Sequence, residues 1–413
     1  MRAPHYSEFA DELLRPAAID SPQTIYARLR SHMPLSRIGE SGVHFVATWA
    51  LVEEALGREE DFSANLTGVL FRGSDGQPAA FELPGTGATD VIATADEPSH
   101  SIHRALAQPR LMAARINTLE DRMRGWVRRA IDPWLASGGG DFAPLSELVP
   151  ALALAHVLGL PERDVSRFRI WAMMGGDMLA GEVDAQRLGF LTEETGKMAA
   201  YLGDHLDIAI AEPDDDPGAP LMHALALGVI AEKLTRSEAI GIAIVMFGAG
   251  GESTAALVGS TLRMLAENPV LAEELRASPE LIPRYVEEVV RLEPPFNFHY
   301  RSVRRPCQLD GYDLDKGDRL MLSWASANRD PAIFEDPDTL RLDRRYPKRH
   351  LGFGRGAHFC IGAPLARLEA RVVLEEVLGS TRSVSLRGAE AAQYAKSIFI
   401  RRLTRLDLET IAA

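Results

Sequence analysis

The sequence predicts a mainly α-helical fold with smaller β-sheets, and three observations lead to this expectation. Helical periodicity dominates the chain from residue 98 to about residue 268. Shorter segments with alternating apolar residues, typical of strands, stand before and after it. The segment 235–269 is apolar enough to form one central helix, which at 1.5 Å per residue would be roughly 45–50 Å long.

The chain is long enough to bury a large core. Its 413 residues are 46% hydrophobic and 25% charged, which is typical of a globular protein. The sequence contains neither a Pro-, Ser- or Gly-rich linker between distinct halves nor an internal repeat. We therefore expect one domain that spans residues 1–413.

The N-terminal part mixes helix and strand. "TIYARLRSHMP" has a helical pattern, "LSRIGESGVHFVATW" alternates like a hairpin, and "ALVEEALGREEDFS" returns to helix. Residues 63–97 are rich in Gly, Pro and Thr and have no sustained helical period. We expect a long loop there, and loops of this length are usually functional or mobile.

The central helix has a clear start, a clear end and an unusual middle. Thr235 and Glu238 have the spacing of a capping box, and Asn268-Pro269 ends the helical pattern. Its first half contains four glycines, each costing about 1 kcal/mol relative to alanine: Gly241, Gly248, Gly250 and Gly251. We expect the close approach of a flat ligand, or a local bulge in the helical hydrogen bonding, to offset this cost.

The C-terminal third is predicted to alternate between helices, strands and loops. We expect a helix at 278–293, a sheet-like section at 296–322 and a loop section up to residue 350. A last helix follows at 363–380, and the tail "SIFIRRLTRLDLE" resembles a hairpin.

Composition excludes several classes of function. A net charge of −13 argues against general nucleic-acid binding, which needs basic surface. Two cysteines, Cys307 and Cys360, are too few for a disulfide framework and favour a reducing cytoplasm. The first 20 residues contain no apolar segment typical of a signal peptide or anchor. The apolar run 239–251 is too short to cross a bilayer, so we expect a buried helix and no membrane span.

One cysteine lies in an unusual setting, the segment "FGRGAHFCIGAPLAR" at 353–367, which we call the cysteine loop. Its glycines free the backbone, and Pro364 predicts a helix start just after Cys360. A sulfur at a helix N-terminus favours the thiolate, which serves as nucleophile, redox switch or metal ligand. No zinc motif accompanies it, and haem iron needs only one protein ligand because the porphyrin supplies four nitrogens. An inert buried cysteine is the alternative.

The cysteine loop resembles the haem-binding signature of the cytochrome P-450 family at every defined position. The matching residues are Phe353, Gly354, Gly356, His358, Cys360, Gly362, Leu365, Ala366 and Arg367. This resemblance implies the cytochrome P-450 fold, a long central helix over haem b, and Cys360 as the axial thiolate ligand. It also implies that Phe353, Gly354, His358 and Gly362 contact the haem.

Other segments extend the resemblance from about residue 49 to the C-terminus. "EEVVR" resembles the ExxR pair of the family, which implies a buried ion pair between Glu288 and Arg291. An isolated ExxR would more often be a surface pair worth a few tenths of a kcal/mol. The resemblance implies that His100, Arg104 and Arg301, with His358, bind the haem propionates.

The segment "AGGEST" stands where the family places its oxygen-activating residues. The resemblance implies that Ala249 and Gly250 line the haem and that Glu252, Ser253 and Thr254 deliver protons. The family has an acid followed by threonine, whereas here Ser253 follows Glu252. We expect oxygen activation with looser coupling and more hydrogen peroxide, unless a one-residue shift brings Thr254 into the role.

Substrate positions follow from the family by position only, and most could equally be core. They are Leu66, Val69, Leu70, Phe81, Met246, Phe296, Asn297, Phe298, Ile398 and Phe399. Most of them are apolar, which favours a small hydrophobic substrate.

The implied activity is that of a monooxygenase, which inserts one oxygen atom from O2 into this substrate. The resemblance implies that a ferredoxin and an NAD(P)H-dependent ferredoxin reductase supply the electrons. We expect the protein to be cytoplasmic and to be a monomer. A basic docking patch is expected at Arg104, Arg344, Arg345, Lys348 and Arg349, unless these form an ordinary solvated charge run. A peroxygenase, other haem-thiolate chemistry such as isomerisation or reduction, and a non-catalytic haem-based sensor of small molecules remain as alternatives.

Overall fold

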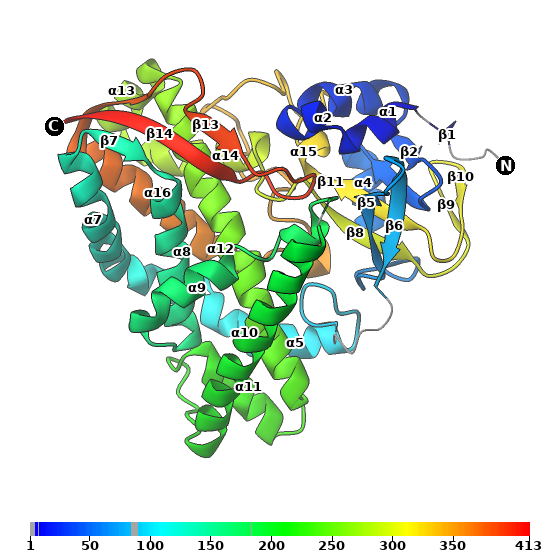
Figure 1. Cartoon of the computed structure of the whole chain (residues 1–413), viewed down its shortest axis with the longest axis horizontal. Helices are drawn as coiled ribbons and strands as arrows, with labels where there is room; N and C mark the ends of the chain where they lie inside the picture. The colour runs from blue at the N-terminus through cyan, green and yellow to red at the C-terminus, as the bar shows by residue number, and fades with distance from the viewer. Residues whose placement is uncertain (1–4, 7, 84–89, 183) are drawn as a thin grey trace.

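The computed structural model describes residues 5–6, 8–83, 90–182 and 184–413, and helices dominate it (Figure 1). The α-helices are α1 (Glu8–Asp11), α2 (Pro16–Asp20), α3 (Gln23–His32), α4 (Trp49–Leu56), α5 (Ser99–Leu111), α6 (Ala113–Ile116), α7 (Glu120–Ala136), α8 (Ala143–Leu158), α9 (Val165–Ala172), α10 (Ala185–Ala211), α11 (Leu221–Ile230), α12 (Arg236–Ala266), α13 (Pro269–Ala277), α14 (Ile282–Leu292), α15 (Trp324–Ala327) and α16 (Ala363–Ser380). Short 3₁₀ turns include η4 (Asp177–Leu179) and η6 (Gly356–His358).

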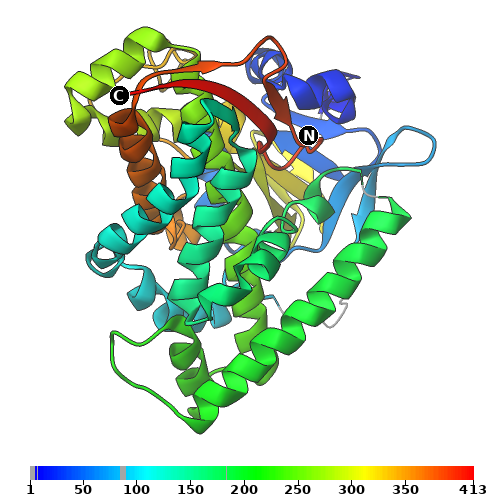
Figure 2. The same ribbon diagram turned by 60° about the vertical axis from the view of Figure 1, so that its left-hand side comes forward.

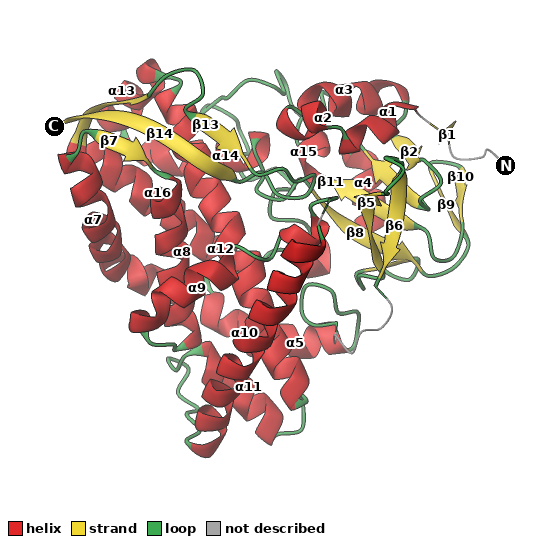
Figure 3. Cartoon of the chain, viewed as in Figure 1, coloured by secondary structure: helices red, strands yellow, loops and turns green. Residues whose placement is uncertain are grey.

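The strands are shorter and gather in two regions, beside the helices and across their top (Figure 3). They are β1 (His5–Tyr6), β2 (Leu35–Ile38), β3 (Val43–Val46), β4 (Phe62–Ser63), β5 (Gly68–Arg72), β6 (Pro78–Glu82), β7 (Gly139–Asp141), β8 (Phe298–Val303), β9 (Cys307–Leu309), β10 (Tyr312–Leu314), β11 (Arg319–Ser323), β12 (Thr381–Leu386), β13 (Ala392–Tyr394) and β14 (Leu403–Ala412). The predicted fold class, mainly α with smaller sheets, is confirmed.

The largest sheet joins distant parts of the chain in the order β1-β2-β3-β11-β8-β4. The predicted hairpin is confirmed, because β2 and β3 pair antiparallel. Strand β11 pairs with β3 in parallel and with β8 in antiparallel. Alternate residues of β11 enter different apolar clusters, Met321 one and Leu320 and Leu322 another. The sheet is therefore covered on both faces, as strand alternation requires.

The predicted loop at 63–97 contains a β-hairpin instead, so that part of the prediction was wrong. Strands β5 and β6 pair antiparallel with Val69 opposite Phe81. The turn between them contains Asp75-Gly76, and Gly76 has a positive φ of 81°. An Asp-Gly pair between apolar runs is a hairpin signal, but it was masked by the surrounding Gly and Pro residues. Residues 84–89 of the stretch lie outside the described residues.

Helix α12 is the central element, and its predicted capping box is present. The Glu238 N–H donates to Thr235 Oγ1 at 3.1 Å, and the Thr235 N–H donates to Glu238 Oε2 at 2.7 Å. Figure 1 and Figure 2 show α12 running through the helical region, with α10 along its outside.

The glycines of α12 allow close packing, and the helix remains α-helical from end to end, so the predicted bulge is absent from it. A Cβ atom at Gly251 would collide with Ala172 at the end of α9, and Gly248 lies directly against Gly175. Contact with the segment that follows α9 therefore offsets much of the cost of these glycines.

Among the described residues, α12 is the one helix long and apolar enough to cross a membrane by length and composition. Of its most apolar window of 18 residues, 56% is buried inside the protein. It packs against α8, α9, α10 and α16. Its apolar surface is thus largely covered by its own chain, as expected for a buried helix.

The C-terminal tail does not form a hairpin with itself, so this prediction was wrong. Its strand β14 pairs with β12, β13 and β7, all of which precede it in the chain. The alternating residues of the tail predict a strand, but they carry no information about its partner. As a result, the segment 397–402 before β14 is brought against the central helix.

Candidate functional site

The cysteine loop is a tight turn closed by backbone hydrogen bonds. The Cys360 N–H donates to the Phe353 carbonyl at 2.9 Å, and the Gly354 N–H donates to the Leu351 carbonyl at 2.8 Å. Gly354 and Gly356 have positive φ angles of 67° and 74°, a conformation that favours glycine. These two glycines therefore have the backbone role expected from the sequence.

The sulfur of Cys360 lies just before α16, but its environment differs from the expectation. Burial raises the pKa of the Cys360 thiol, although the N–H groups of Gly362 and Ala363 and the charge of Arg367 lower it. The N–H groups of the helix terminus lower the pKa as the sequence predicted, but in the chain alone the desolvation of the sulfur outweighs them. A thiolate at this position needs a cation beside the sulfur, as haem iron would provide.

A cavity of about 230 Å³ lies next to the cysteine loop, and we call it the histidine cavity. It is lined by Ala55, Leu56, Glu59, Glu60, Phe62, Ala64, Asp96, Glu97, His100, Arg301, Arg304, Arg355, Ala357 and His358. The rings of His100 and His358 lie 4.0 Å apart. His100 Nε2 and His358 Nδ1 are buried without a hydrogen-bond partner in the described structure. Two unpartnered ring nitrogens beside an arginine fit the propionate groups of a haem.

Arg301 is a buried cation with few partners. It lies on β8, only 8% exposed, and its Nη1 donates to the carbonyl of its neighbour Tyr300 at 2.7 Å. Burial lowers the pKa of Arg301 to about 10, against the opposing charges of Asp96 and Glu59. A carboxylate ligand in the histidine cavity would supply the counter-charge that this guanidinium needs.

Arg104 does not line the histidine cavity. Its Nη1 donates to the Phe359 carbonyl at 2.8 Å, next to Cys360, and its Nε donates to Gln108 at 3.2 Å. Of the four predicted propionate partners, His100, Arg301 and His358 are therefore brought together, whereas Arg104 supports the backbone of the cysteine loop.

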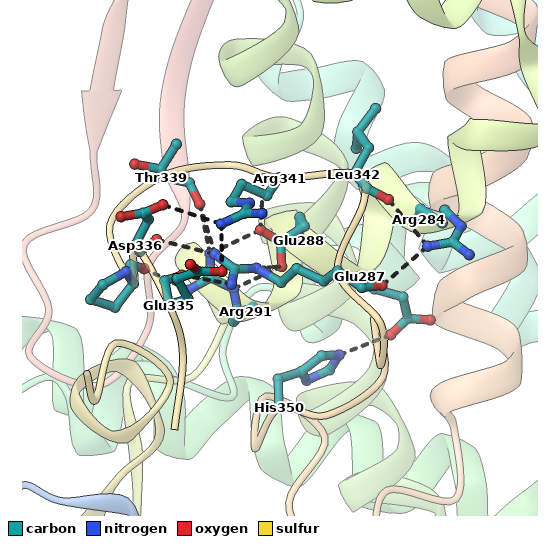
Figure 4. Close-up of polar contacts among 12 residues, drawn as sticks. Arg284, Glu287, Glu288, Arg291, Glu335, Asp336, Thr339, Arg341, Leu342 and His350 are labelled. Atoms are coloured by element: carbon teal, nitrogen blue, oxygen red, sulfur yellow. Dashed lines mark hydrogen bonds and ion pairs between the residues drawn. The ribbon is translucent and has the colours of Figure 1, made fainter. Parts of the chain in front are cut away.

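The expected ion pair between Glu288 and Arg291 is present and buried (Figure 4). The Arg291 Nε and Nη2 atoms donate to the two Glu288 oxygens at 2.7 and 2.9 Å. Arg291 also donates to the carbonyls of Asn328, Pro337 and Thr339. The pair thus fixes α14 to the segment that leads to the cysteine loop, as a surface pair would not.

Arg344 belongs to this network, which changes the predicted docking patch. Its Nε donates to Glu288 at 3.0 Å, and its side chain is only 10% exposed. Its remaining donors bind the carbonyls of Glu335, Asp336 and Thr339. Arg344 therefore supports the fold and cannot offer its charge to a partner.

A second network, missed from the sequence, joins α14 to the cysteine loop. Glu287 accepts hydrogen bonds from Arg367 Nε at 2.6 Å and from His350 Nε2 at 2.8 Å, as Figure 4 shows for His350. The Arg367 guanidinium lies 4.4 Å from the Phe353 ring. Burial alone would raise the pKa of Glu287, but its two partners hold it at about 2. The second glutamate of "EEVVR" was the sequence feature from which this network could have been predicted.

On α12, Ser253 and Glu252 are both engaged by the protein. Ser253 Oγ donates to the Ala249 carbonyl one turn earlier at 2.5 Å, and Ala249 is exposed although it lies in the middle of α12. Glu252 is 1% exposed and accepts from the Gly176 N–H at 2.7 Å and from Arg402 Nε at 2.9 Å. Burial raises the pKa of Glu252, while Arg402 opposes the rise. Arg402 could not be found from sequence.

The remaining residues of the oxygen side differ in exposure. Thr254 is buried, and Gly250, which lies against Leu154, is half-buried.

The predicted substrate positions divide into two groups. Val69, Leu70, Phe298, Ile398 and Phe399 are buried in one apolar cluster, with Leu66 and Phe296 packed against it. Met246 is buried in the cluster around α12, and the Asn297 side chain donates to the Ile398 carbonyl at 2.9 Å. Phe81, by contrast, is 47% exposed on the hairpin and contacts Phe71. Phe81 is therefore a surface residue in this structure.

Comparison with known proteins identifies the origin of this arrangement. The Cytochrome P450 family model matches residues 277–382. Cytochrome P450 144 of Mycobacterium tuberculosis is 38% identical, over 95% of this chain and 89% of its own. Mycinamicin IV hydroxylase/epoxidase of Micromonospora griseorubida is 34% identical, over 68% and 70%.

Solved structures agree with these relatives. CYP109E1 of Bacillus megaterium, solved in complex with testosterone, superposes with a TM-score of 0.81 at 27% identity, covering 95% of this chain and 99% of its own. The residues that match the family model include α14 and the cysteine loop, which the hydrogen bonds of Glu287 join. An identity of 38% along nearly the whole chain is too extensive for a shared fold alone, so this chain belongs to the cytochrome P450 family.

Proposed function

We propose that this cytochrome P450 inserts one oxygen atom of O2 into a small hydrophobic substrate, within one domain of residues 1–413. The observation that carries the proposal is the histidine cavity, which the cysteine loop lines through Ala357 and His358 and which contains the unpartnered His100 and His358 nitrogens. This arrangement supports binding of haem b with Cys360 as the axial ligand. Bound haem would supply the redox chemistry that activates dioxygen.

The residues of the chain would hold and orient this group. His100, Arg301 and His358 would bind the propionates, since all three line one cavity. Phe353, Gly354 and Gly362 would lie against the ring on the cysteine side, and Ala249 and Gly250 would lie on the other. Arg367 and Glu287 keep the cysteine loop in register with α14.

Proton delivery is assigned to Glu252, Ser253 and Thr254. The Ser253 hydroxyl can donate a hydrogen bond to a ligand once its hydrogen bond to the Ala249 carbonyl is broken. The Glu252 carboxylate is bound by Gly176 and Arg402, so it can move a proton only after at least one of these bonds is exchanged. Ser253 lacks the methyl group that restricts threonine, which favours partial release of hydrogen peroxide.

Electrons would come from a ferredoxin and its NAD(P)H-dependent reductase. Arg345, Lys348 and Arg349 are exposed shortly before the cysteine loop and form the proposed docking patch. Arg104 completes it, since it contacts the loop at Phe359. An acidic ferredoxin would fit this charge. We place the protein in the cytoplasm as a monomer.

The substrate is proposed to be hydrophobic and to carry some oxygen atoms. The apolar cluster around Phe298 and Phe399 supports the first property. The second is suggested by one relative that is named for mycinamicin IV and by one structural neighbour that was solved in complex with testosterone.

The proposal is tested first by the carbon monoxide difference spectrum of the reduced, purified protein. Thiolate ligation by Cys360 gives the long-wavelength band of the family, and its absence would refute haem-thiolate chemistry. Spectral titration with a panel of hydrophobic compounds follows, then turnover with O2 and a reduced ferredoxin. Turnover with hydrogen peroxide alone would instead favour a peroxygenase. If compounds bind but none is turned over by either route, a sensor role is favoured.

A further inference from the structure

His103 is a buried residue of α5 that no function assigned above uses, and its ring lies between two other parts of the chain. His103 Nδ1 accepts a hydrogen bond from the Ile92 N–H at 3.1 Å. On the other side of the ring, Nε2 lies 3.8 Å from Glu238 Oε1, in the first turn of α12. Ile92 belongs to residues 91–96, which precede α5 in the chain and which we call the return segment. His103 therefore joins the return segment to α5 and α12.

The Ile92 N–H fixes the protonation state of the His103 ring. A backbone N–H can only donate, so Nδ1 must be the unprotonated nitrogen, and Nε2 carries the ring proton toward Glu238. Burial lowers the pKa of His103, the Glu238 carboxylate opposes this shift, and the charge of His100 adds to it. The ring is therefore neutral at neutral pH, and its Nδ1 atom is available as an acceptor.

Ile92 has a backbone conformation that its side chain disfavours. Its φ angle is 39°, in the left-handed region where β-branched residues are rare. A residue in this conformation costs free energy and persists only where its surroundings hold it. The hydrogen bond to His103 holds its backbone, and the main apolar cluster buries the side chains of Ile92 and Val91. Val91 also lies against Gly241 of α12, so the return segment is fitted to the central helix.

The return segment in turn holds the base of the β5–β6 hairpin. The Asn65 side chain donates to the Thr94 carbonyl at 2.6 Å. Asp96 accepts hydrogen bonds from the Ala64 N–H at 2.9 Å and from Ser63 Oγ at 2.5 Å. Strand β5, which carries two of the predicted substrate positions, begins shortly after these residues. The position of the hairpin therefore depends on the position of the return segment.

We propose that His103 is a positioning residue for the substrate side of the protein. Neutral His103 holds Ile92, and through the return segment it holds the hairpin that carries the substrate positions of β5. Protonation of Nδ1 removes this acceptor, and the charged ring is attracted by Glu238 instead, so the return segment is released. The consequence for the substrate side rests on the proposed function, whereas the release itself needs neither substrate nor turnover.

The release should occur in acidic solution. Because the pKa of His103 is lowered in the folded protein, the hydrogen bond from Ile92 is intact above pH 6.5 and is lost as the pH falls below it. Among the described residues, the charged groups that act on His103 are Glu238 of α12 and His100 of its own helix. Asp90 stands directly before the return segment, and burial raises its pKa. The test must therefore separate the titration of Asp90 from that of His103.

Four variants and a control separate the acceptor from the charge. His103→Asn keeps an acceptor, because asparagine Oδ1 stands near the place of Nδ1, and it does not titrate. His103→Leu removes the acceptor at every pH. Glu238→Gln keeps an oxygen for the capping box but removes the carboxylate charge, which lowers the pKa of His103 further. Asp90→Asn removes the neighbouring carboxyl group. His32→Asn, at an exposed histidine of α3, serves as the control.

Hydrogen exchange of the haem-loaded protein measures the release directly. Peptides that cover residues 90–96 are followed by mass spectrometry between pH 8 and pH 5.5, after correction for the intrinsic pH dependence of exchange. In wild type and in His32→Asn, protection should fall by about five- to tenfold as the pH falls, the usual effect of one hydrogen bond. His103→Asn should stay protected throughout, and His103→Leu should be unprotected throughout. In Glu238→Gln, the fall should move to lower pH.

The rate of carbon monoxide binding to the reduced protein, measured by flash photolysis, reports on the substrate side. Release of the hairpin should open the path to the iron, so the rate in wild type should rise by a few fold as the pH falls. His103→Leu should already show the faster rate at pH 8. His103→Asn should keep the slower rate at pH 5.5.

Wild-type protection of residues 90–96 in His103→Leu would overturn the proposal. So would a pH-dependent release that persists in His103→Asn but disappears in Asp90→Asn, because Asp90 would then be the titrating group. Equal carbon monoxide rates in all variants would refute the link to the substrate side. The carbon monoxide difference band of the wild-type protein is read in parallel. Its absence refutes the proposed function, whereas its presence with an inert His103→Leu refutes this inference alone.

Discussion

Glu252 and Arg402 join two parts of the chain that are 150 residues apart. The Arg402 Nε atom lies 2.9 Å from Glu252 Oε1, in the middle of α12. The second oxygen of Glu252 accepts from the Gly176 N–H, between α9 and η4. One carboxylate therefore ties the central helix to the segment after α9 and to the start of the C-terminal strand.

Replacing Arg402 should destabilise the protein in a pH-dependent way. Arg402→Leu leaves a buried carboxylate without its cation, which costs about 3 kcal/mol of unfolding free energy at neutral pH. Because the pKa of Glu252 is already raised above 4.5, its stabilising contribution is lost as the pH rises. Without Arg402 the pKa of Glu252 should rise further, so the variant should go on losing stability up to a higher pH than wild type. Urea unfolding between pH 5 and 8 measures it, with the exposed Arg405→Leu as control; equal loss in both variants would contradict the prediction.

Replacing Glu287 should weaken the dependence of the unfolding free energy on pH in acidic solution. The pKa of Glu287 is about 2 in the folded protein against 4.5 for a free glutamate. Its contribution, on the order of 3 kcal/mol, is present above pH 4.5 and lost as the pH falls toward 2. Glu287→Gln should therefore narrow the stability difference between pH 6 and pH 3. Glu273→Gln, on the exposed face of α13, should leave that difference unchanged.

The sequence identifies the parts of the site whose residues are close together in the chain. Cys360, His358 and the loop glycines lie within one short segment, and Glu288 and Arg291 lie within one helical turn. The spacing of these residues in the sequence is enough to predict that they lie close together in the structure. The capping box of α12 was predictable for the same reason.

Partners from distant segments were not predictable. Arg402 reaches Glu252, and Trp324 reaches His299, only because β14 and β11 are placed by the sheets. Nothing in the local composition of "FIRRL" distinguishes the arginine at 402 from a solvated one. The exposure of Phe81 could not be predicted for a related reason, because the strand pairing of β5 with β6 decides which face it occupies.

Removing the Arg301 charge should weaken haem retention. Arg301→Leu deletes the buried guanidinium of the histidine cavity, and a hydrogen bond between charged groups is worth more than a neutral one. Haem transfer to apomyoglobin should accelerate by roughly ten- to a hundredfold. Arg305→Leu, an exposed position outside the cavity lining, should transfer haem at the wild-type rate. Equal acceleration in the two variants would argue against Arg301 as a propionate partner.

The hydroxyl group at position 253 should control the release of hydrogen peroxide. Ser253→Thr keeps the hydroxyl and adds the methyl group that restricts its rotamer, so the peroxide formed per NAD(P)H consumed should fall. Ser253→Ala should raise it. A surrogate ferredoxin and reductase suffice for this measurement. If Thr254→Ala raises the peroxide fraction and Ser253→Ala does not, Thr254 holds the role instead.

The exposed and the buried basic residues near the cysteine loop should respond differently to mutation. Lys348→Glu reverses a charge on the exposed docking patch, and we expect reduction by an acidic ferredoxin to slow by about tenfold at low salt. The difference from wild type should shrink as ionic strength rises, because exposed charges are screened. Arg344→Leu should instead lower the unfolding free energy by about 1–3 kcal/mol, because its guanidinium binds buried Glu288. Stopped-flow reduction and urea unfolding separate the two effects. A salt-independent loss in Lys348→Glu would remove this face as the docking site, and a fully stable Arg344→Leu would show that Arg291 alone supports Glu288.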